Sequence, residues 1–137
     1  MRSRRGANAI EFALTAPIFF GIMLALMDYG WFFANQAGLD NATANGCREG
    51  ALQDPADKKT PKPIAHAKRE IKTRAAMFCD DNCITTVLDL NSGVYAIPQR
   101  SLQCSTSMTF APLVGFAPVP KTITSTSFYR LEWQRTP

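Results

Sequence analysis

An uninterrupted apolar run near the N-terminus dominates the pattern of apolar and polar residues. No charged residue occurs from Phe12 to Met27, and after Asp28 the apolar character continues to Ala34. These 23 residues would be roughly 35 Å long as a helix, enough to cross a hydrocarbon core of about 30 Å. Small and polar residues then keep a helical spacing, so we expect the helix to continue to about residue 52.

The remainder of the chain is predicted to form a second helix and a small antiparallel sheet. Apolar residues recur at helical spacing from Ile64 to Phe78, after a loop rich in proline and lysine. Alternating patterns predict three strands, at about residues 84–90, 101–110 and 121–133. Even positions from Leu102 to Phe110 form the apolar side of the clearest strand. The predicted class is therefore α+β, with a long N-terminal helix and a second helix packed on a small antiparallel sheet.

Three features of these elements carry further expectations. Asp28 interrupts the apolar run, and we expect it to be solvated, with a contact to another subunit as the alternative. The apolar loop from Ala111 to Pro120 contains three prolines and is expected to cap the core of the domain. Contact of this loop with another subunit or with a membrane surface is the alternative. One narrow face of the long helix is expected to consist of Ala37, Ala44, Cys47, Ala51 and Leu52.

Composition and charge narrow the class of protein. The 137 residues are 46% apolar and 19% charged, which suits one small folded domain. Most of the net charge of +4 comes from Arg2, Arg4 and Arg5, because the chain from Ala7 onward has 12 basic and 11 acidic residues. A nucleic-acid-binding surface is therefore not expected. Arginines before the apolar run predict a membrane helix with a cytoplasmic N-terminus, with Tyr29 and Trp31 at the outer interface. A cleavable secretory signal and a buried helix of a soluble domain are the alternatives.

Four cysteines lie in the part of the chain predicted to be exported, and an even number there implies two disulfides with three possible connectivities. Cys104 is on the apolar side of its strand and Cys47 can face inward from the long helix, so we favour a bridge between them. That pairing leaves Cys79 with Cys83. A zinc site is the alternative, although Cys79 and Cys83 lack the usual two-residue gap and no second pair of closely spaced cysteines occurs. Because no convergent catalytic set occurs, we expect neither enzymatic activity nor a cofactor or metal site.

The residues before the apolar run form a processing pattern. Arg4 and Arg5 precede Gly6, and Glu11 follows five positions later at the head of the helix. This arrangement resembles the type III signal of pilins and pseudopilins, in which a membrane aspartyl peptidase cuts after the glycine. The resemblance implies a cut between Gly6 and Ala7. The new ammonium group would share a helix face with Glu11, whose carboxylate could pair with the ammonium of a neighbouring subunit. Interaction of Glu11 with the positive end of the helix dipole is the alternative.

The resemblance extends along the long helix. The matching features are Ile10-Glu11-Phe12-Ala13-Leu14, Ala16-Pro17, an acidic residue before Tyr29-Gly30, Gln36, and Arg48-Glu49-Gly50-Ala51. In these features the chain is similar to the TadE-like family, the minor pilins or pseudopilins of tight-adherence (Tad, Flp-type) pili. The resemblance implies a prepilin leader at 1–6, a transmembrane helix at 7–34 and an extracytoplasmic, pilin-like α+β head at 35–137.

The same resemblance implies a location and a set of partners. It places the protein in a bacterial inner membrane with a periplasmic head, and outside the cell once it joins a pilus. The implied partners are prepilin peptidase, other pilins or minor pilins, the Tad inner-membrane machinery and the membrane itself. The alternative is a signal-anchored adhesive or sensory protein that is neither processed nor polymerised.

Overall fold

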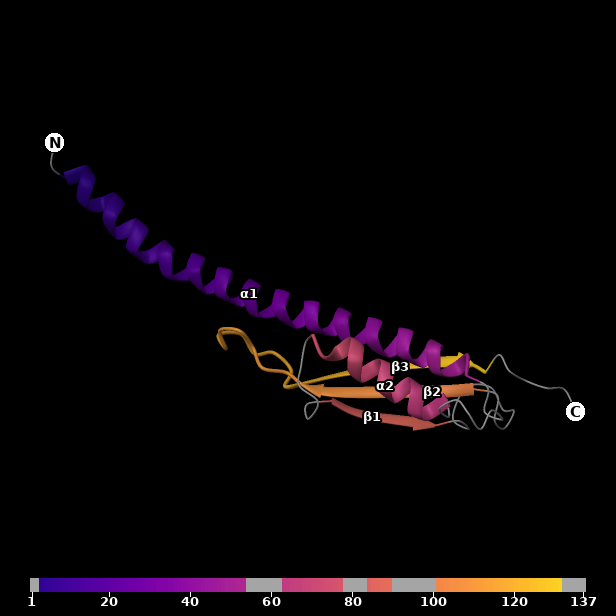
Figure 1. Cartoon of the computed structure of the whole chain (residues 1–137). Coiled ribbons are helices and arrows are strands. Elements are labelled where there is room, and N and C mark those ends of the chain that lie inside the picture. The colour runs from indigo at the N-terminus through magenta and orange to yellow at the C-terminus, as the bar shows by residue number, and fades with distance from the viewer. Residues whose placement is uncertain (1–2, 54–62, 78–83, 90–100, 132–137) are drawn as a thin grey trace, which may run out of the picture.

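The computed structural model describes residues 3–53, 63–77, 84–89 and 101–131 of the chain. Five elements occur in these ranges: α1 (Ser3–Ala51), α2 (Pro63–Ala75), β1 (Ile84–Asp89), β2 (Ser101–Thr109) and β3 (Thr122–Arg130). They confirm the predicted α+β class. Figure 1 shows the two helices packed on the sheet to form a head, with the N-terminal half of α1 extending far beyond it.

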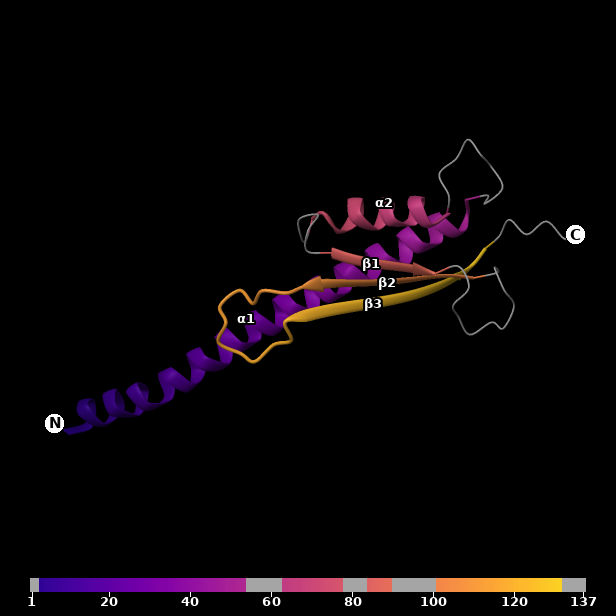
Figure 2. The ribbon, with the colours of Figure 1, turned by 90° about the horizontal axis from the view of Figure 1, so that it is seen from below.

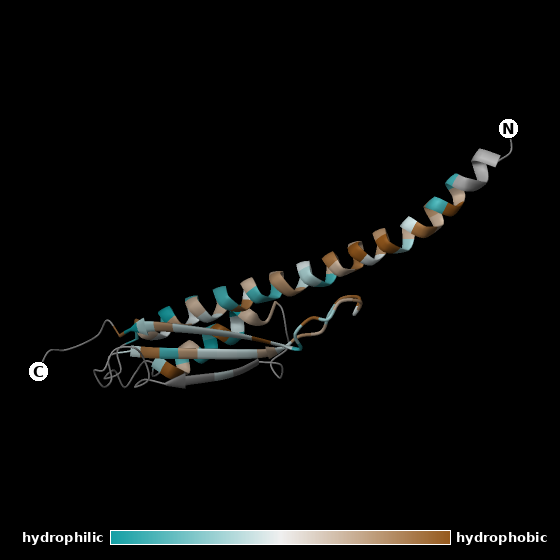
Figure 3. Cartoon of the chain, turned by 180° about the vertical axis from the view of Figure 1, so that it is seen from behind, coloured by the Kyte–Doolittle hydropathy of each residue, from teal (hydrophilic) through white to brown (hydrophobic). Residues whose placement is uncertain are grey.

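α1 is a single helix of 49 residues and continues through Pro17. Before Asp28 most of its apolar side chains are exposed, on several sides of the helix, and Leu24 is half-buried. The exposed side chains include Ile10, Phe12, Leu14, Ile18, Phe19, Phe20, Ile22, Met23, Leu26 and Met27. Figure 3 shows that the most hydrophobic part of α1 lies outside the head. We call residues 8–27 the apolar half of α1.

From Asn35 onward, α1 packs on the head along a row of side chains four residues apart, as neighbours on one helix face are. The buried row is Asn35, Leu39, Thr43, Cys47 and Ala51. The narrow face expected from the sequence is therefore right for two members of this row, Cys47 and Ala51, and wrong for Ala37, which is exposed. Ala37 lies two residues from Leu39, about 200° around the helix, so it faces away from the head.

The sheet is antiparallel, and β2 is its central strand between β1 and β3. In the register of the sheet, Cys104 lies opposite Leu88 of β1 and Ser127 of β3. Even positions of β2 face the helices, as the alternation predicted, and the buried residues among them are Leu102, Cys104, Thr106 and Met108. The predicted positions Leu90, Trp133 and, after α2, Phe78 lie outside the described residues.

α1 and α2 approach each other closely at two glycines of α1. A Cβ atom on Gly46 would lie 2.5 Å from Cγ1 of Ile71, and one on Gly50 would lie 2.5 Å from Cβ of Ala67. Favourable carbon contacts are about 3.5–4.0 Å, so only glycine fits at these two positions without movement of α2. Ala67, Ile71 and Ala75 form the buried face of α2, as their spacing predicted. Figure 2 shows the two helices side by side from below.

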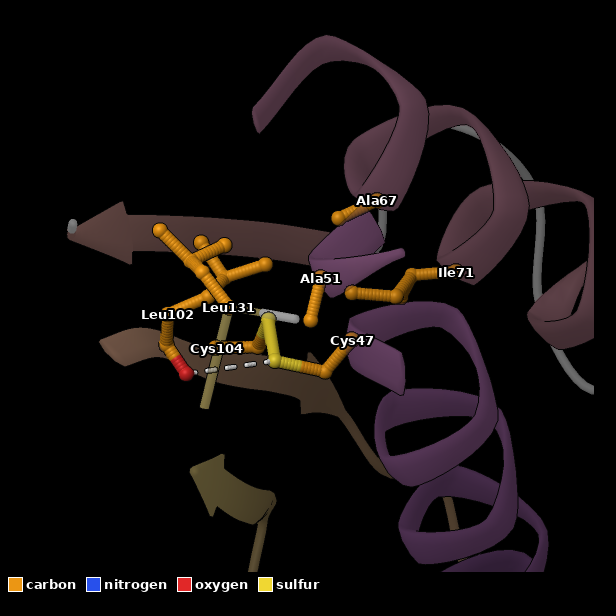
Figure 4. Close-up of a cluster of buried hydrophobic side chains, with 7 residues drawn as sticks. All are labelled: Cys47, Ala51, Ala67, Ile71, Leu102, Cys104 and Leu131. Carbon is orange, nitrogen blue, oxygen red and sulfur yellow. Dashed lines mark hydrogen bonds between the residues drawn. A yellow bond between two sulfur atoms is a disulfide. The ribbon is translucent and has the colours of Figure 1, made fainter. Parts of the chain in front are cut away.

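A disulfide joins Cys47 of α1 to Cys104 of β2, which is the pairing that the sequence favours. The two Cα atoms are 5.9 Å apart, a usual separation for such a bridge. Figure 4 shows the bridge inside a buried cluster with Ala51, Ala67, Ile71, Leu102 and Leu131. Sγ of Cys47 also contacts the carbonyl oxygen of Leu102 at 3.7 Å, without donating a hydrogen because the bridged sulfur carries none. Cys79 and Cys83 lie outside the described residues.

Candidate membrane anchor and its junction with the head

The apolar half of α1 is a candidate membrane anchor. It belongs to a helix that is long and apolar enough to cross a membrane, and the most apolar window of that helix is not buried by the rest of the described chain. Exposed apolar surface on this scale is unfavourable in water, so another apolar phase or another protein must cover it. The cytoplasmic orientation of the N-terminus stays a prediction.

The predicted leader and cleavage residues lie at the very start of α1. Residues 4–7 are helical, and Arg2 lies outside the described residues. Glu11 follows on the next turn with an exposed side chain. Because Ala7 and Glu11 are four residues apart in a continuous helix, they lie on the same helix face. The structure thus places the two residues on one helix face, while the cut after Gly6 and the pairing of Glu11 with a neighbouring subunit stay predictions.

Asp28 is not solvated, contrary to the expectation from the sequence. Its side chain is fully buried where the apolar half of α1 meets the head. Oδ1 accepts hydrogen bonds from the backbone N–H groups of Val114 and Gly115, at 2.8 and 3.2 Å. Oδ2 accepts from the N–H groups of Phe116 and Ala117, at 2.8 and 3.1 Å. A buried carboxylate without such partners would be strongly unfavourable, so these four donors explain how Asp28 can be buried.

The four donors belong to residues 111–120, which connect β2 to β3 and which we call the junction loop. Gly115 has a φ of +77°, in the left-handed region where glycine is favoured. This backbone turn helps successive N–H groups point at one anion, in the manner of an anion-binding nest. Next to Asp28, the hydroxyl of Tyr29 donates a hydrogen bond to the carbonyl oxygen of Pro118, at 3.3 Å. The junction loop is therefore attached to α1 through two successive side chains.

The junction loop caps the core only in its second half. Ala117 is buried, and Val119 packs against the core cluster that contains Leu39. The first half of the loop is exposed, including Leu113, Val114 and Phe116. The expectation that the loop caps the core is therefore correct for one part of it, and the other part presents apolar side chains outward.

The sequence contained a signal for the Asp28 contact, although the expectation of solvation missed it. An acid inside an apolar run needs a polar or charged group to interact with. Backbone N–H groups of a glycine-containing loop without charges can supply one, but their positions are 86 to 89 residues away in the chain. No side-chain pattern marks a backbone donor, so the pairing becomes visible only when β2 and β3 bring the loop to α1.

Within the described ranges, no group of three or more His, Cys, Asp and Glu side chains could hold a metal ion. The expectation that the chain is not an enzyme stays a prediction.

In the part of the chain that the structure describes, one exposed apolar helix is joined to a small α+β head, which defines the class as a head on a candidate helical membrane anchor. The family model described as TadE-like protein matches residues 6–48, which confirms the resemblance over the N-terminal third of the chain. The match includes Glu11, Asp28 and Cys47, and it ends just before Gly50. A TadE-like segment indicates a Tad pilus-related function and an association with pilus machinery in general. No curated protein and no solved structure shows a significant match to the chain.

Proposed function

We propose that the chain is a TadE-like minor pilin or pseudopilin that takes part in Tad (Flp-type) pilus assembly, with a structural role rather than a catalytic one. The exposed apolar half of α1 is the observation that carries this proposal. Lipid would cover this surface while the protein waits in the bacterial inner membrane with its head in the periplasm. Apolar helices of other pilins would cover it after assembly, so the same surface serves both states.

Maturation by prepilin peptidase is the second part of the proposal. Cleavage after Gly6 would remove residues 1–6 with their three arginines and leave a free ammonium group on Ala7. The bond to be cut lies within the first turns of α1, so the peptidase must unwind that end of the helix. Glycine there makes unwinding easier, because glycine stabilises a helix by about 1 kcal/mol less than alanine does.

The N-terminal residue of the native protein tests this step. Intact-mass measurement on protein from its own membrane should give a chain that begins at Ala7. A chain that keeps residues 1–6 and still builds pili would contradict the processing step. A chain that keeps them and never enters a pilus would support the alternative, a signal-anchored adhesive or sensory protein.

Glu11 is the proposed assembly residue. Its carboxylate is exposed at the head of the apolar half of α1, where a neighbouring subunit can reach it. Inside an apolar bundle, this carboxylate and the Ala7 ammonium of a neighbour would each be unfavourable alone, and pairing offsets the loss of water for both. The contact would therefore form only when a processed neighbour is in place.

We expect Glu11→Gln to leave membrane insertion and the head intact and to reduce strongly the amount of the protein that co-purifies with pili. Glu70→Gln is the matched control, because Glu70 lies on α2 in the head and its carboxylate oxygens are 3.9 Å from nitrogens of Arg69 and Arg74. The control should co-purify like the unaltered protein. Normal piliation by the Glu11→Gln variant would show that the pairing role is wrong.

A further inference from the structure

The junction loop has an exposed apolar tip that the proposed function does not use. Leu113, Val114 and Phe116 expose 59%, 47% and 59% of their surface. Residues 111–120 are alanine, proline, leucine, valine, glycine and phenylalanine only, without a charged or polar side chain. A contiguous apolar surface of this kind is a site that another apolar phase covers.

The tip lies beside the apolar half of α1 and extends beyond the end of the sheet, as Figures 1 and 2 show. A Cβ atom on Gly21 would lie 3.4 Å from Cζ of Phe116, so the phenyl ring is in contact range of the helix there. Gly21 precedes Asp28 by seven residues, or about 10 Å along the helix axis. It lies well inside the charge-free run from Phe12 to Met27. Phe116 is therefore level with the candidate membrane span.

This level does not depend on where the membrane span begins. A span of about 20 residues that begins at Ala7 ends near residue 26, and one that begins at Phe12 ends near Trp31. Gly21 is then about five to ten residues, or about 8 to 15 Å, inside the outer end of the span. In both cases the ring of Phe116 lies at the depth of the hydrocarbon.

The backbone of the junction loop also suits a medium without water, where every unpaired N–H group is unfavourable. Three of its ten residues are prolines, which have no N–H group. Four more, residues 114–117, donate their N–H groups to Asp28. Asp28 benefits in turn, because a carboxylate near the hydrocarbon is tolerated only with strong partners. Asp28 therefore accepts hydrogen bonds from four of the seven N–H groups of the loop, and the loop supplies the partners that the carboxylate needs.

We propose that the tip of the junction loop enters the outer leaflet beside α1, so that the chain contacts lipid through two elements instead of one. The exposed tip and the exposed side chains of α1 at the same level form one continuous apolar surface, which lipid acyl chains cover together. This inference rests on the proposed anchorage of α1 in a membrane and is independent of pilus assembly. Two insertion points would fix the rotation of the head about the axis of α1 and its height above the membrane.

Depth-dependent quenching of a single tryptophan tests the inference in the full-length chain. Trp31 and Trp133 are replaced by phenylalanine, and Phe116→Trp supplies the probe. The protein is placed in phosphatidylcholine vesicles whose acyl chains carry bromine, which quenches tryptophan on contact. We expect blue-shifted emission and strong quenching at position 116.

The matched control is Phe128→Trp in the same background. Phe128 lies on β3 in the head and exposes 44% of its surface, so it resembles Phe116 in type and exposure. Quenching at position 128 should be several-fold weaker than at position 116. Equal quenching at the two positions would overturn the inference. The inference would also be overturned if the tryptophan at position 116 were not quenched by bromine and its emission shifted to the blue only at high protein-to-lipid ratio. A second copy of the chain, and not lipid, would then cover the tip.

Flotation of the same samples separates this inference from the proposed anchorage. Protein that fails to float with vesicles refutes the anchorage, and the inference with it. Protein that floats but shows no quenching at position 116 refutes the loop insertion alone. A third variant, Asp28→Ala in the Phe116→Trp background, should reduce the quenching, because four unpaired N–H groups would disfavour insertion. Asp40→Ala, which changes an exposed acid of α1, should leave it unchanged.

Discussion

The two halves of α1 share one backbone and obtain their stability from different sources. In the packed half, residues 35–51, buried positions recur every four residues, and glycines at positions 46 and 50 bring α2 within contact distance. In the apolar half, large side chains are exposed on several sides, and the nearest part of the head is the tip of the junction loop. A helix with a stripe of small buried residues is stabilised by its own chain, whereas a helix that is apolar all round needs an external partner.

This difference predicts that substitutions in the two halves act on different properties. Changes in the packed half should alter the free energy of unfolding of the head and leave membrane association alone. Changes in the apolar half should alter association with lipid or with other subunits and leave the head folded. Asp28 lies between the two halves, where its substitution should release the junction loop and weaken its contact with lipid while the sheet of the head stays folded.

The largest expected effect on the packed half comes from the disulfide. Cys47 and Cys104 are 57 residues apart, so the bridge should contribute about 4 kcal/mol by the loop-entropy relation. We expect Cys47→Ala with Cys104→Ala to lower the free energy of unfolding of the head by about that amount, measured by urea titration in detergent. Cys79→Ala with Cys83→Ala should lower it by only about 2 kcal/mol, because that predicted bridge would close a short loop. Equal losses would indicate a different connectivity.

The next effect tests the close approach of the two helices. Gly50→Ala would place a methyl group 2.5 Å from Cβ of Ala67 and 2.8 Å from the carbonyl oxygen of Pro63. Overpacking of this kind costs about 1–3 kcal/mol, which exceeds the gain in helix propensity of up to about 1 kcal/mol. The head should therefore lose about 1–2 kcal/mol in the same urea titration. Gly30→Ala is the control, because nothing lies within 4 Å of its Cβ position, and it should be neutral or slightly stabilising.

The features predicted correctly from the sequence are those that depend on the local spacing of apolar residues. The extent of α1, the buried face of α2 and the inward side of β2 all follow from spacings of four or two residues. The face of α1 that meets the sheet was predicted only in part, because alanine occurs on several sides of the helix and does not mark a buried side. The partners of Asp28 could not be predicted, because they are backbone groups brought to α1 by a loop in a distant part of the sequence.

A smaller and more local effect is expected at the boundary between the two halves. Asp28→Ala should speed hydrogen exchange of the amides of residues 114–117, which donate to its carboxylate, and leave exchange in β2 and β3 unchanged. Asp28→Asn should restore only part of the protection, because an amide oxygen replaces two acceptor oxygens and the amide nitrogen meets further donors. Uniformly faster exchange through the whole sheet would mean that Asp28 supports the head itself and does not act as a local attachment of the loop.

The smallest expected effect separates the two side chains that attach the junction loop to α1. The hydroxyl of Tyr29 donates to the carbonyl oxygen of Pro118 at 3.3 Å, a long hydrogen bond of a side chain that is 39% exposed. Such a bond contributes at most about 0.5 kcal/mol, at the lower end of measured values. Tyr29→Phe keeps the ring and removes only this donor, so exchange of the loop amides should barely change. If Tyr29→Phe released those amides as fully as Asp28→Ala does, the carboxylate would not be the main attachment. The apolar half and the head would then be joined chiefly by an interfacial aromatic residue, and the reason for burying an acid at the end of an apolar helix would be lost.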